Sequence, residues 1–157
     1  DPVRGILIVE TKHGLVCANA GIDSSNVPGE ETVSLLPEDP DLSAKKIKES
    51  IVRQTGVEVA VIVSDTFGRP WRYGHVDFAI GVAGMDPFYD YRGRVDTQGK
   101  VLNVTRIALA DELSAAAEVV MGKTLSIPVV LVRGCEYLKG EFGSGELLRD
   151  HSEDLFR

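Results

Sequence analysis

The stretch Val57–Gly74, VEVAVIVSDTFGRPWRYG, decides how the rest of the chain can fold. Six of the seven residues Val57–Val63 are Val, Ile or Ala, which predicts a strand that is buried on both faces. This apolar run ends at Ser64-Asp65, and Gly68 and Pro70 predict a loop directly after it. An aspartate between a rigid strand and a loop is well placed to hold a metal ion beside phosphates. For this motif alone, an aspartate that only caps a turn is the simpler interpretation.

Length and composition limit the classes of protein to which the chain can belong. Its 157 residues fit one domain, with two small lobes as an alternative, and 43% hydrophobic and 26% charged residues are ordinary for a globular protein. A net charge of −7 argues against nucleic acid or an anionic membrane as the main partner. No apolar run reaches the length of a membrane span and no signal peptide is recognisable, so we expect a cytoplasmic protein. Cys17 and Cys135 lie in or beside apolar segments and are expected to be reduced thiols.

The rest of the chain alternates strand-like and helical patterns. One helix is expected to begin at Pro40, with Asp39 as its N-cap, and to stop at Gly56, and a second should cover Ala110–Met121. Met85–Gly99 contains three aspartates and three aromatic residues, and we expect an irregular or hairpin segment that acts as a lid or a partner contact. The other strands are predicted at Gly5–Val9, Leu15–Ala18, Val76–Gly84, Val101–Ala108 and Ile127–Val132.

A second aspartate lies in a setting like that of Asp65. Asp23 follows an apolar strand and lies in a loop of small polar residues. Two carboxylates with the hydroxyls of Ser24 and Thr66 would form an all-oxygen set, which suits Mg²⁺ or Mn²⁺, whereas the histidines and cysteines have no zinc-site spacing. On this evidence, one shared metal site and two independent turn aspartates are equally supported.

Two further motifs concern anions. Gly122-Lys123-Thr124 resembles the end of a Walker A loop, but the required earlier glycine is Ala117 and the order of strand and helix is reversed. We therefore reject a P-loop and interpret Gly122 as a helix stop. Arg69 and Arg72 are candidates for binding an anionic ligand, with solvent-facing loop charges as the alternative.

Six segments in this order resemble the coenzyme F420-0:gamma-glutamyl ligase family, and the resemblance as a whole extends over nearly the whole chain. They are NAGIDSSN (Asn19–Asn26), VSDTFGRPWRYG (Val63–Gly74), DFAIGVAG (Asp77–Gly84), RGRVDTQGKVLNVT (Arg92–Thr105), ADELSAAAEVVMGK (Ala110–Lys123) and IPVVLVRG (Ile127–Gly134). Family members carry an additional N-terminal segment, and because the sequence starts at Asp1 without a methionine we expect either a fragment or a chain whose partner segment is separate.

The resemblance implies an α+β fold with mixed β-sheets, flanking helices and an intertwined homodimer. It implies a ligase that joins L-glutamate to F420-0 with GTP, a divalent metal (Mn²⁺ or Mg²⁺) and K⁺. Asp23 and Asp65 would be the catalytic metal ligands, Thr66 would lie beside a second metal, and Met121 would give a backbone carbonyl oxygen to a metal.

The resemblance also implies a GTP site, with Asn26 contacting the nucleotide and Val119, Val120, Met121, Gly122 and Lys123 lining the pocket. GTP would phosphorylate the terminal carboxylate of F420-0, and glutamate would attack the acyl phosphate. Two alternatives remain open. One is a metal-dependent phosphohydrolase or phosphotransferase on the same aspartates, and the other is a non-catalytic remnant of the ligase.

Overall fold

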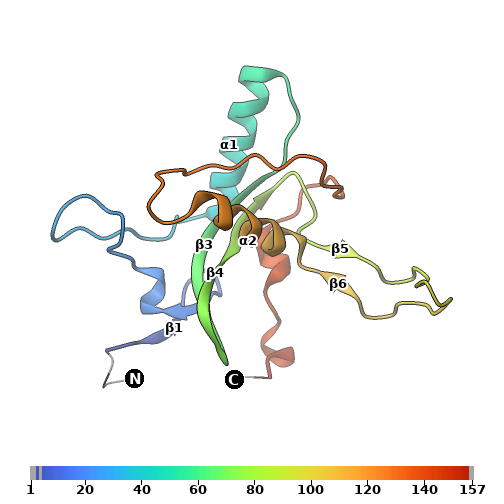
Figure 1. Ribbon diagram of the computed structural model, residues 1–157, viewed down its shortest axis with the longest axis horizontal. Coiled ribbons are helices and arrows are strands. Elements are labelled where there is room, and N and C mark those ends of the chain that lie inside the picture. Colours follow the sequence, from blue (N-terminus) through green and yellow to red (C-terminus); the bar gives the residue numbers. More distant parts are fainter. Residues whose placement is uncertain (1–2, 4, 156–157) are drawn as a thin grey trace.

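The computed structural model describes residue 3 and residues 5–155, which form an α+β fold around one long β-hairpin (Figure 1). The elements are β1 (Ile8–Glu10), β2 (Val16–Ala18), the 3₁₀ helix η1 (Asn19–Gly21), α1 (Pro40–Thr55), β3 (Val61–Arg69), β4 (Arg72–Ala83), β5 (Tyr89–Asp90), β6 (Arg106–Ile107), α2 (Leu109–Met121), and the 3₁₀ helices η2 (Ser144–Leu147) and η3 (His151–Glu153). The strands pair as β1–β2, β3–β4 and β5–β6, and each pair is antiparallel. The prediction of mixed sheets is therefore wrong for the described residues, whereas the α+β class is confirmed.

The β3–β4 hairpin continues through the region where the sequence predicts a loop. Its register runs from Val61 opposite Ala83 to Arg69 opposite Arg72, so Asp65 lies in the middle of β3. The prediction that Asp65 ends a strand is wrong, because pairing with β4 satisfies the backbone on both sides of it. Only Pro70-Trp71 turns the chain, and a proline followed by a residue at φ 56° is typical of a type II turn.

Burial along the two strands differs from the prediction as well. Residues 57–60 form no strand, and β3 is partly buried over most of its length, because within the described chain only β4 pairs with it. The core lies on β4 and beyond it, where Ala79, Val82 and Met85 pack with Ala110 of α2. The prediction of a strand at Val76–Gly84 is confirmed, and β4 extends it to Arg72.

Acidic side chains cover the outer edge of β4, where no strand of the described chain pairs. The Glu118 carboxylate of α2 accepts the N–H of Asp77 at 3.0 Å. The Asp111 carboxylate of the same helix accepts the N–H of Ala79 at 2.9 Å. Asp41 of α1 accepts the N–H of Val82 at 2.7 Å. Partners shift from Val63–Gly81 to Ser64–Ala79, which leaves Ile80 as the extra residue of a β-bulge. The bulge turns the Val82 N–H to the same edge, so both helices satisfy donors that another strand would otherwise bind.

Helix α1 has the ends that the sequence predicts. The Asp39 carboxylate accepts the N–H of Leu42 at 2.8 Å, and Gly56 ends the helix in the left-handed region at φ 70°. The helix begins directly on β4, because a Cβ built on Gly81 would lie 2.3 Å from the carbonyl oxygen of Pro40. Glycine at position 81 is therefore required by close packing between α1 and β4.

Two predicted strands are absent or shortened, while the β1–β2 hairpin and α2 are confirmed. Residues 127–132 form no strand and expose Val129 and Leu131, because within the described chain no strand lies beside them. Of Val101–Ala108 only Arg106–Ile107 is a strand, paired with β5. This pair belongs to an arm that projects from the body and includes the 85–100 segment (Figure 1), whose role as a lid stays a prediction.

The cysteines and the helices agree with the remaining expectations. Cys17 and Cys135 are both free thiols; Cys17 is buried as expected, whereas Cys135 is only partly buried. Neither α1 nor α2, nor any other helix of the described chain, combines the length and the hydropathy that a membrane span requires.

Candidate active site

Asp65 and Thr66 point to opposite faces of β3, as neighbours in a strand do. Asp65 pairs in register with Phe78, and Thr66 pairs with Asp77. The side chains of Asp65 and Phe78 therefore share one face of the hairpin, and those of Thr66 and Asp77 share the other. The Asp65 carboxylate also accepts the N–H of Thr66 at 2.8 Å, which holds it at the strand.

Asp77 organises the second face. Its buried carboxylate accepts two hydroxyl groups from β3, that of Thr66 at 2.6 Å and that of Ser64 at 3.0 Å. Because Thr66 gives its hydroxyl hydrogen to Asp77, the lone pairs of the Thr66 oxygen are left for a cation.

In this structure the cation at the Thr66 oxygen is the ammonium group of Lys123. Its ammonium group donates to the Thr66 hydroxyl and lies 3.9 Å from Asp77 Oδ1 and 4.0 Å from Glu118 Oε1. Lys123 follows the C-terminal end of α2, which ends at Met121, so the helix brings both Glu118 and Lys123 to the hairpin.

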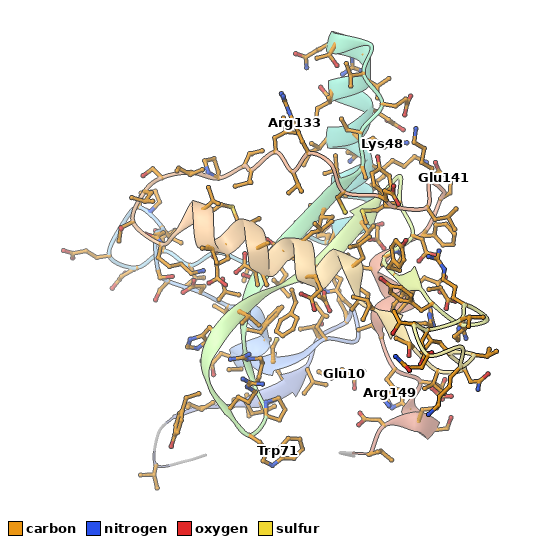
Figure 2. The ribbon with its side chains drawn as sticks, turned by 45° about the vertical axis from the view of Figure 1, so that its right-hand side comes forward. Glu10, Lys48, Trp71, Arg133, Glu141 and Arg149 are labelled. Atoms are coloured by element: carbon orange, nitrogen blue, oxygen red, sulfur yellow. The ribbon has the colours of Figure 1, made fainter. Side chains whose placement is uncertain are left out.

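Asp23 reaches the same region from the other end of the chain. Its backbone pairs with Ser34, and its carboxylate accepts the Ser25 amide at 2.8 Å and the Ser25 hydroxyl at 2.5 Å. These two hydrogen bonds, with a contribution from the Lys123 charge, hold the pKa of Asp23 below its ordinary value. Both views of the molecule place the loop that contains Asp23 on the side to which the C-terminal end of α2 points (Figures 1 and 2).

The charges of these groups act on Asp65. Burial is the main reason why the pKa of Asp65 is raised, and the carboxylates of Asp77 and Asp23 raise it further. The Thr66 N–H and the Lys123 ammonium act in the opposite direction but do not cancel the increase. Asp23 and Asp65 are therefore close enough to interact, although 42 positions separate them in the sequence.

The chemistry of the donors fits a hard divalent cation. Carboxylates of Asp23, Asp65 and Asp77 and the hydroxyl of Thr66 are oxygen ligands of the kind that Mg²⁺ and Mn²⁺ prefer. As the described residues stand, no three His, Cys, Asp or Glu side chains converge closely enough to hold a metal. The Lys123 ammonium lies against Thr66, Asp77 and Glu118, and a metal ion on that face of the hairpin would have to displace it.

Of the residues expected at the nucleotide, the segment 119–123 reaches this cluster through Lys123. Val119 and Val120 are exposed in the last turn of α2, Met121 is partly buried, and Gly122 and Lys123 are exposed beyond it. Asn26 is exposed in the Asp23 loop, with its backbone in the left-handed region at φ 53°. The fold thus brings all five positions of the 119–123 segment to the end of α2, where Lys123 contacts Thr66.

The two arginines predicted to bind an anion differ in position. Arg69 is partly buried, and its Nη2 donates to the Tyr73 carbonyl oxygen at 3.1 Å, whereas Arg72 is exposed at the start of β4. Both flank the hairpin tip, where Figure 2 shows Trp71 pointing away from the body.

The structure adds Asp77 and Glu118, which were not among the predicted site residues. Asp77 lies near the start of the apolar run Val76–Gly84, and an acid in such a run is a signal that could have identified it. Glu118 carried no such signal, because one glutamate on an amphipathic helix is ordinary.

Comparisons with known proteins agree with this picture. The family model described as F420-0:Gamma-glutamyl ligase matches residues 2–134. A protein of Methanothermobacter thermautotrophicus named coenzyme F420:L-glutamate ligase is 49% identical over 154 residues, which are 96% of this chain and 61% of that protein. Its namesake from Methanocaldococcus jannaschii is 45% identical over 155 residues, 98% of this chain and 61% of that protein. The chain therefore spans about 61% of the length of these relatives, and it belongs to the F420-0:gamma-glutamyl ligase family.

Proposed function

We propose that the protein acts in a GTP-dependent ligase that adds L-glutamate to F420-0 through an acyl phosphate. Family membership and the names of the relatives support the reaction class. The observation that carries the proposal is that Asp23, although distant in the sequence, lies near enough to Asp65 for its charge to raise the pKa of Asp65. Beside them lies the Thr66–Asp77–Lys123 cluster.

The chemistry requires an activated acid. A carboxylate and an amine do not condense in water, because the carboxylate has no good leaving group. In the proposed reaction the terminal carboxylate of F420-0 takes the γ-phosphoryl group of GTP and GDP leaves. The amine of glutamate then attacks the acyl carbon, phosphate leaves, and an amide bond forms.

Each residue of the site would have a separate role in phosphoryl transfer. Asp23 and Asp65 would hold Mn²⁺ or Mg²⁺, which when bound offsets the charge of the transferring group. Thr66 and the carbonyl oxygen of Met121 are the candidates for a second cation, with K⁺ as a further possibility for the assembled site. Asp77 would orient the Thr66 hydroxyl, and Lys123, once displaced, would be free to bind a phosphate oxygen.

The nucleotide would lie at the end of α2. Asn26 and the segment 119–123 are our candidates for contacting GTP, and all of these residues except the partly buried Met121 are exposed to a ligand. Arg69 and Arg72 are the candidates for an anionic group of F420-0. We also propose a homodimer, which the exposed apolar segment at 127–132 supports.

One incubation separates the ligase from its competitors. The full-length protein is mixed with GTP, L-glutamate, F420-0 and Mn²⁺ or Mg²⁺, and the products are analysed by mass spectrometry. A ligase gives a product heavier by one glutamate residue together with GDP and phosphate. GDP without the heavier product would indicate a phosphohydrolase or phosphotransferase. Absence of nucleotide binding by calorimetry would indicate a non-catalytic remnant and would contradict the proposal.

A further inference from the structure

Lys123 places its ammonium group against three side chains that carry oxygen atoms. It donates to the Thr66 hydroxyl and lies 3.9 Å from Asp77 Oδ1 and 4.0 Å from Glu118 Oε1. Thr66 in turn donates to Asp77 Oδ1 at 2.6 Å, so its oxygen faces Lys123 with its lone pairs. A hard metal ion binds to lone pairs of the same kind. The ammonium group therefore occupies the position that a metal ion bound to Thr66 would need.

The burial of Asp77 makes a cation at this position necessary. Asp77 is only 5% exposed, and the hydroxyls that it accepts, from Ser64 and Thr66, are neutral. Glu118 adds a second carboxylate, because its Oε2 accepts the Asp77 N–H at 3.0 Å. Within the described residues, the ion pairs of these two acids are those with Lys123. A buried carboxylate without a cation is costly, so Lys123 can leave only when another cation replaces it.

The contacts that hold Lys123 are nevertheless weak enough to exchange. Its side chain is 58% exposed, and its two ion pairs are longer than the ~2.7–2.9 Å of a direct charged hydrogen bond. Lys123 also lies beyond the end of α2 at Met121, and Gly122 between them has its backbone in the left-handed region at φ 56°. The ammonium group can therefore move without unwinding the helix.

The charge of Lys123 also reaches both proposed metal ligands. The pKa of Asp65 is raised, first of all by burial, and the Lys123 charge acts against that increase. The pKa of Asp23 is lowered, first of all by its hydrogen bonds with Ser25, and the Lys123 charge adds to the decrease. A positive charge that favours both ionised carboxylates also repels a further cation beside them. Lys123 therefore opposes metal binding at the two aspartates as well as at Thr66.

We propose that Lys123 is a built-in competitor of the metal ion, whose ammonium group fills the cation position at Thr66 and Asp77 until a metal replaces it. The released lysine then lies at the end of α2, where phosphate oxygens of a nucleotide would bind it. Metal and nucleotide both favour the state in which Lys123 is released, so each raises the affinity for the other. This coupling rests on the proposed function, whereas the competition with metal does not.

Manganese alone is the probe for the competition. Binding of Mn²⁺ to the full-length protein is followed without nucleotide, from the electron paramagnetic resonance signal of the free ion. Lys123→Gln removes the competitor and should bind Mn²⁺ at least about tenfold more tightly than the unmodified protein. Lys123→Arg keeps the charge and should stay within about threefold of it. Lys100→Gln removes an exposed charge between β5 and β6 and should change the affinity by less than about twofold.

A double substitution tests whether the competition takes place at Asp77. In a protein that already carries Asp77→Asn, Lys123→Gln should change the Mn²⁺ affinity by less than about twofold, because the cation position is already weakened. A Lys123→Gln protein with an unchanged circular dichroism spectrum and no gain in Mn²⁺ affinity would overturn the inference. An equal gain in Lys100→Gln, or a gain that Asp77→Asn leaves intact, would overturn it as well.

A non-hydrolysable GTP analogue, guanosine 5′-(β,γ-imido)triphosphate, tests the coupling by calorimetry. Saturating Mn²⁺ should tighten its binding to the unmodified protein, and this gain should be at least about fivefold smaller in Lys123→Gln. An equal gain in both proteins would overturn the coupling. Tighter Mn²⁺ binding by Lys123→Gln in a protein that binds no nucleotide supports the competition and contradicts the proposed function. Ligase activity together with a Mn²⁺ affinity unchanged by Lys123→Gln contradicts the inference about Lys123 alone.

Discussion

Asp65 is the residue on which the proposed chemistry depends most. Asp65→Asn keeps an oxygen that can accept the Thr66 N–H but removes the charge that would hold a metal ion. We expect metal-dependent GTP turnover of the full-length protein to fall by about 100-fold or more. Turnover is measured from GDP release at saturating metal, and a rate like that of the unmodified protein would remove Asp65 from the site.

The same substitution should make the metal-free protein more stable at neutral pH. Burial raises the folded-state pKa of Asp65 above its ordinary value of 3.8. The folded protein therefore holds this proton more tightly than the unfolded chain, and stability decreases as pH rises from 3.8 through the raised pKa. The neutral amide of an asparagine at this position carries no such penalty. With EDTA present, Asp65→Asn should unfold at higher urea concentration at pH 7, and this difference should shrink as the pH approaches 3.8.

Asp77 acts through Thr66, so it is a positioning residue and has its own prediction. Asp77→Asn weakens the hold on the Thr66 hydroxyl, and we expect the metal concentration for half-maximal GTP turnover to rise about 10–100-fold. The maximal rate at saturating metal should change less. Glu58→Gln, an exposed acid at the other end of the hairpin, is the control. A purely structural role would lower the melting temperature of Asp77→Asn without moving the metal titration.

At the scale of elements, the close contact between α1 and β4 can be tested directly by mutation. A methyl group at Gly81 would lie 2.3 Å from the Pro40 carbonyl oxygen, and the helix start would have to move. We expect Gly81→Ala to lower the free energy of unfolding by about 1–3 kcal/mol, as measured in urea. Gly145→Ala is the matched control, because a Cβ there has no atom within 4 Å. Equal stability of the two variants would refute the close contact.

The arm formed by β5 and β6 has an electrostatic test of its own. Arg92 donates to both carboxylate oxygens of Asp90, at distances of 2.6–3.0 Å, and these bonds lower the pKa of Asp90 to about 2. A lowered pKa contributes stability above the unfolded value of 3.8, which is lost as the pH falls through about 2. Arg92→Gln should return the pKa of Asp90 towards 3.8, as measured by NMR titration of the carboxyl carbon. An unchanged value would show that the pair does not form in solution.

At the scale of the whole molecule, the exposed apolar segment at 127–132 carries the prediction of a homodimer. Val129 is 77% exposed and Leu131 is 66% exposed, although both are strand-forming or core-forming types. Light scattering of the full-length protein should give twice the mass of one chain. Leu131→Asp should shift the mass towards the monomer, whereas Lys139→Asp on an already polar loop should not. A monomeric unmodified protein would contradict the proposal.

Local signals in the sequence were sufficient for the two long helices and for the β1–β2 hairpin. Asp39, Pro40 and Gly56 act within a few residues of themselves, so the bounds of α1 could be predicted from capping and backbone preference alone. The β1–β2 hairpin follows from the same kind of short-range pattern. Residues 127–132 show the limit, because a β-branched run becomes a strand only when another strand lies beside it.

The sequence by itself determined the fold class, the helix ends, the reduced cysteines and the family, because these depend on local chemistry or on an ordered set of motifs. Only the tertiary structure decided that Asp65 lies inside a hairpin, that Glu118 caps the edge of β4, and that Lys123 bonds Thr66. The physical reason is sequence distance: Thr66 and Lys123 are 57 residues apart, and packing of α2 against β4 brings them together. No local sequence pattern around Thr66 or Lys123 predicts that contact.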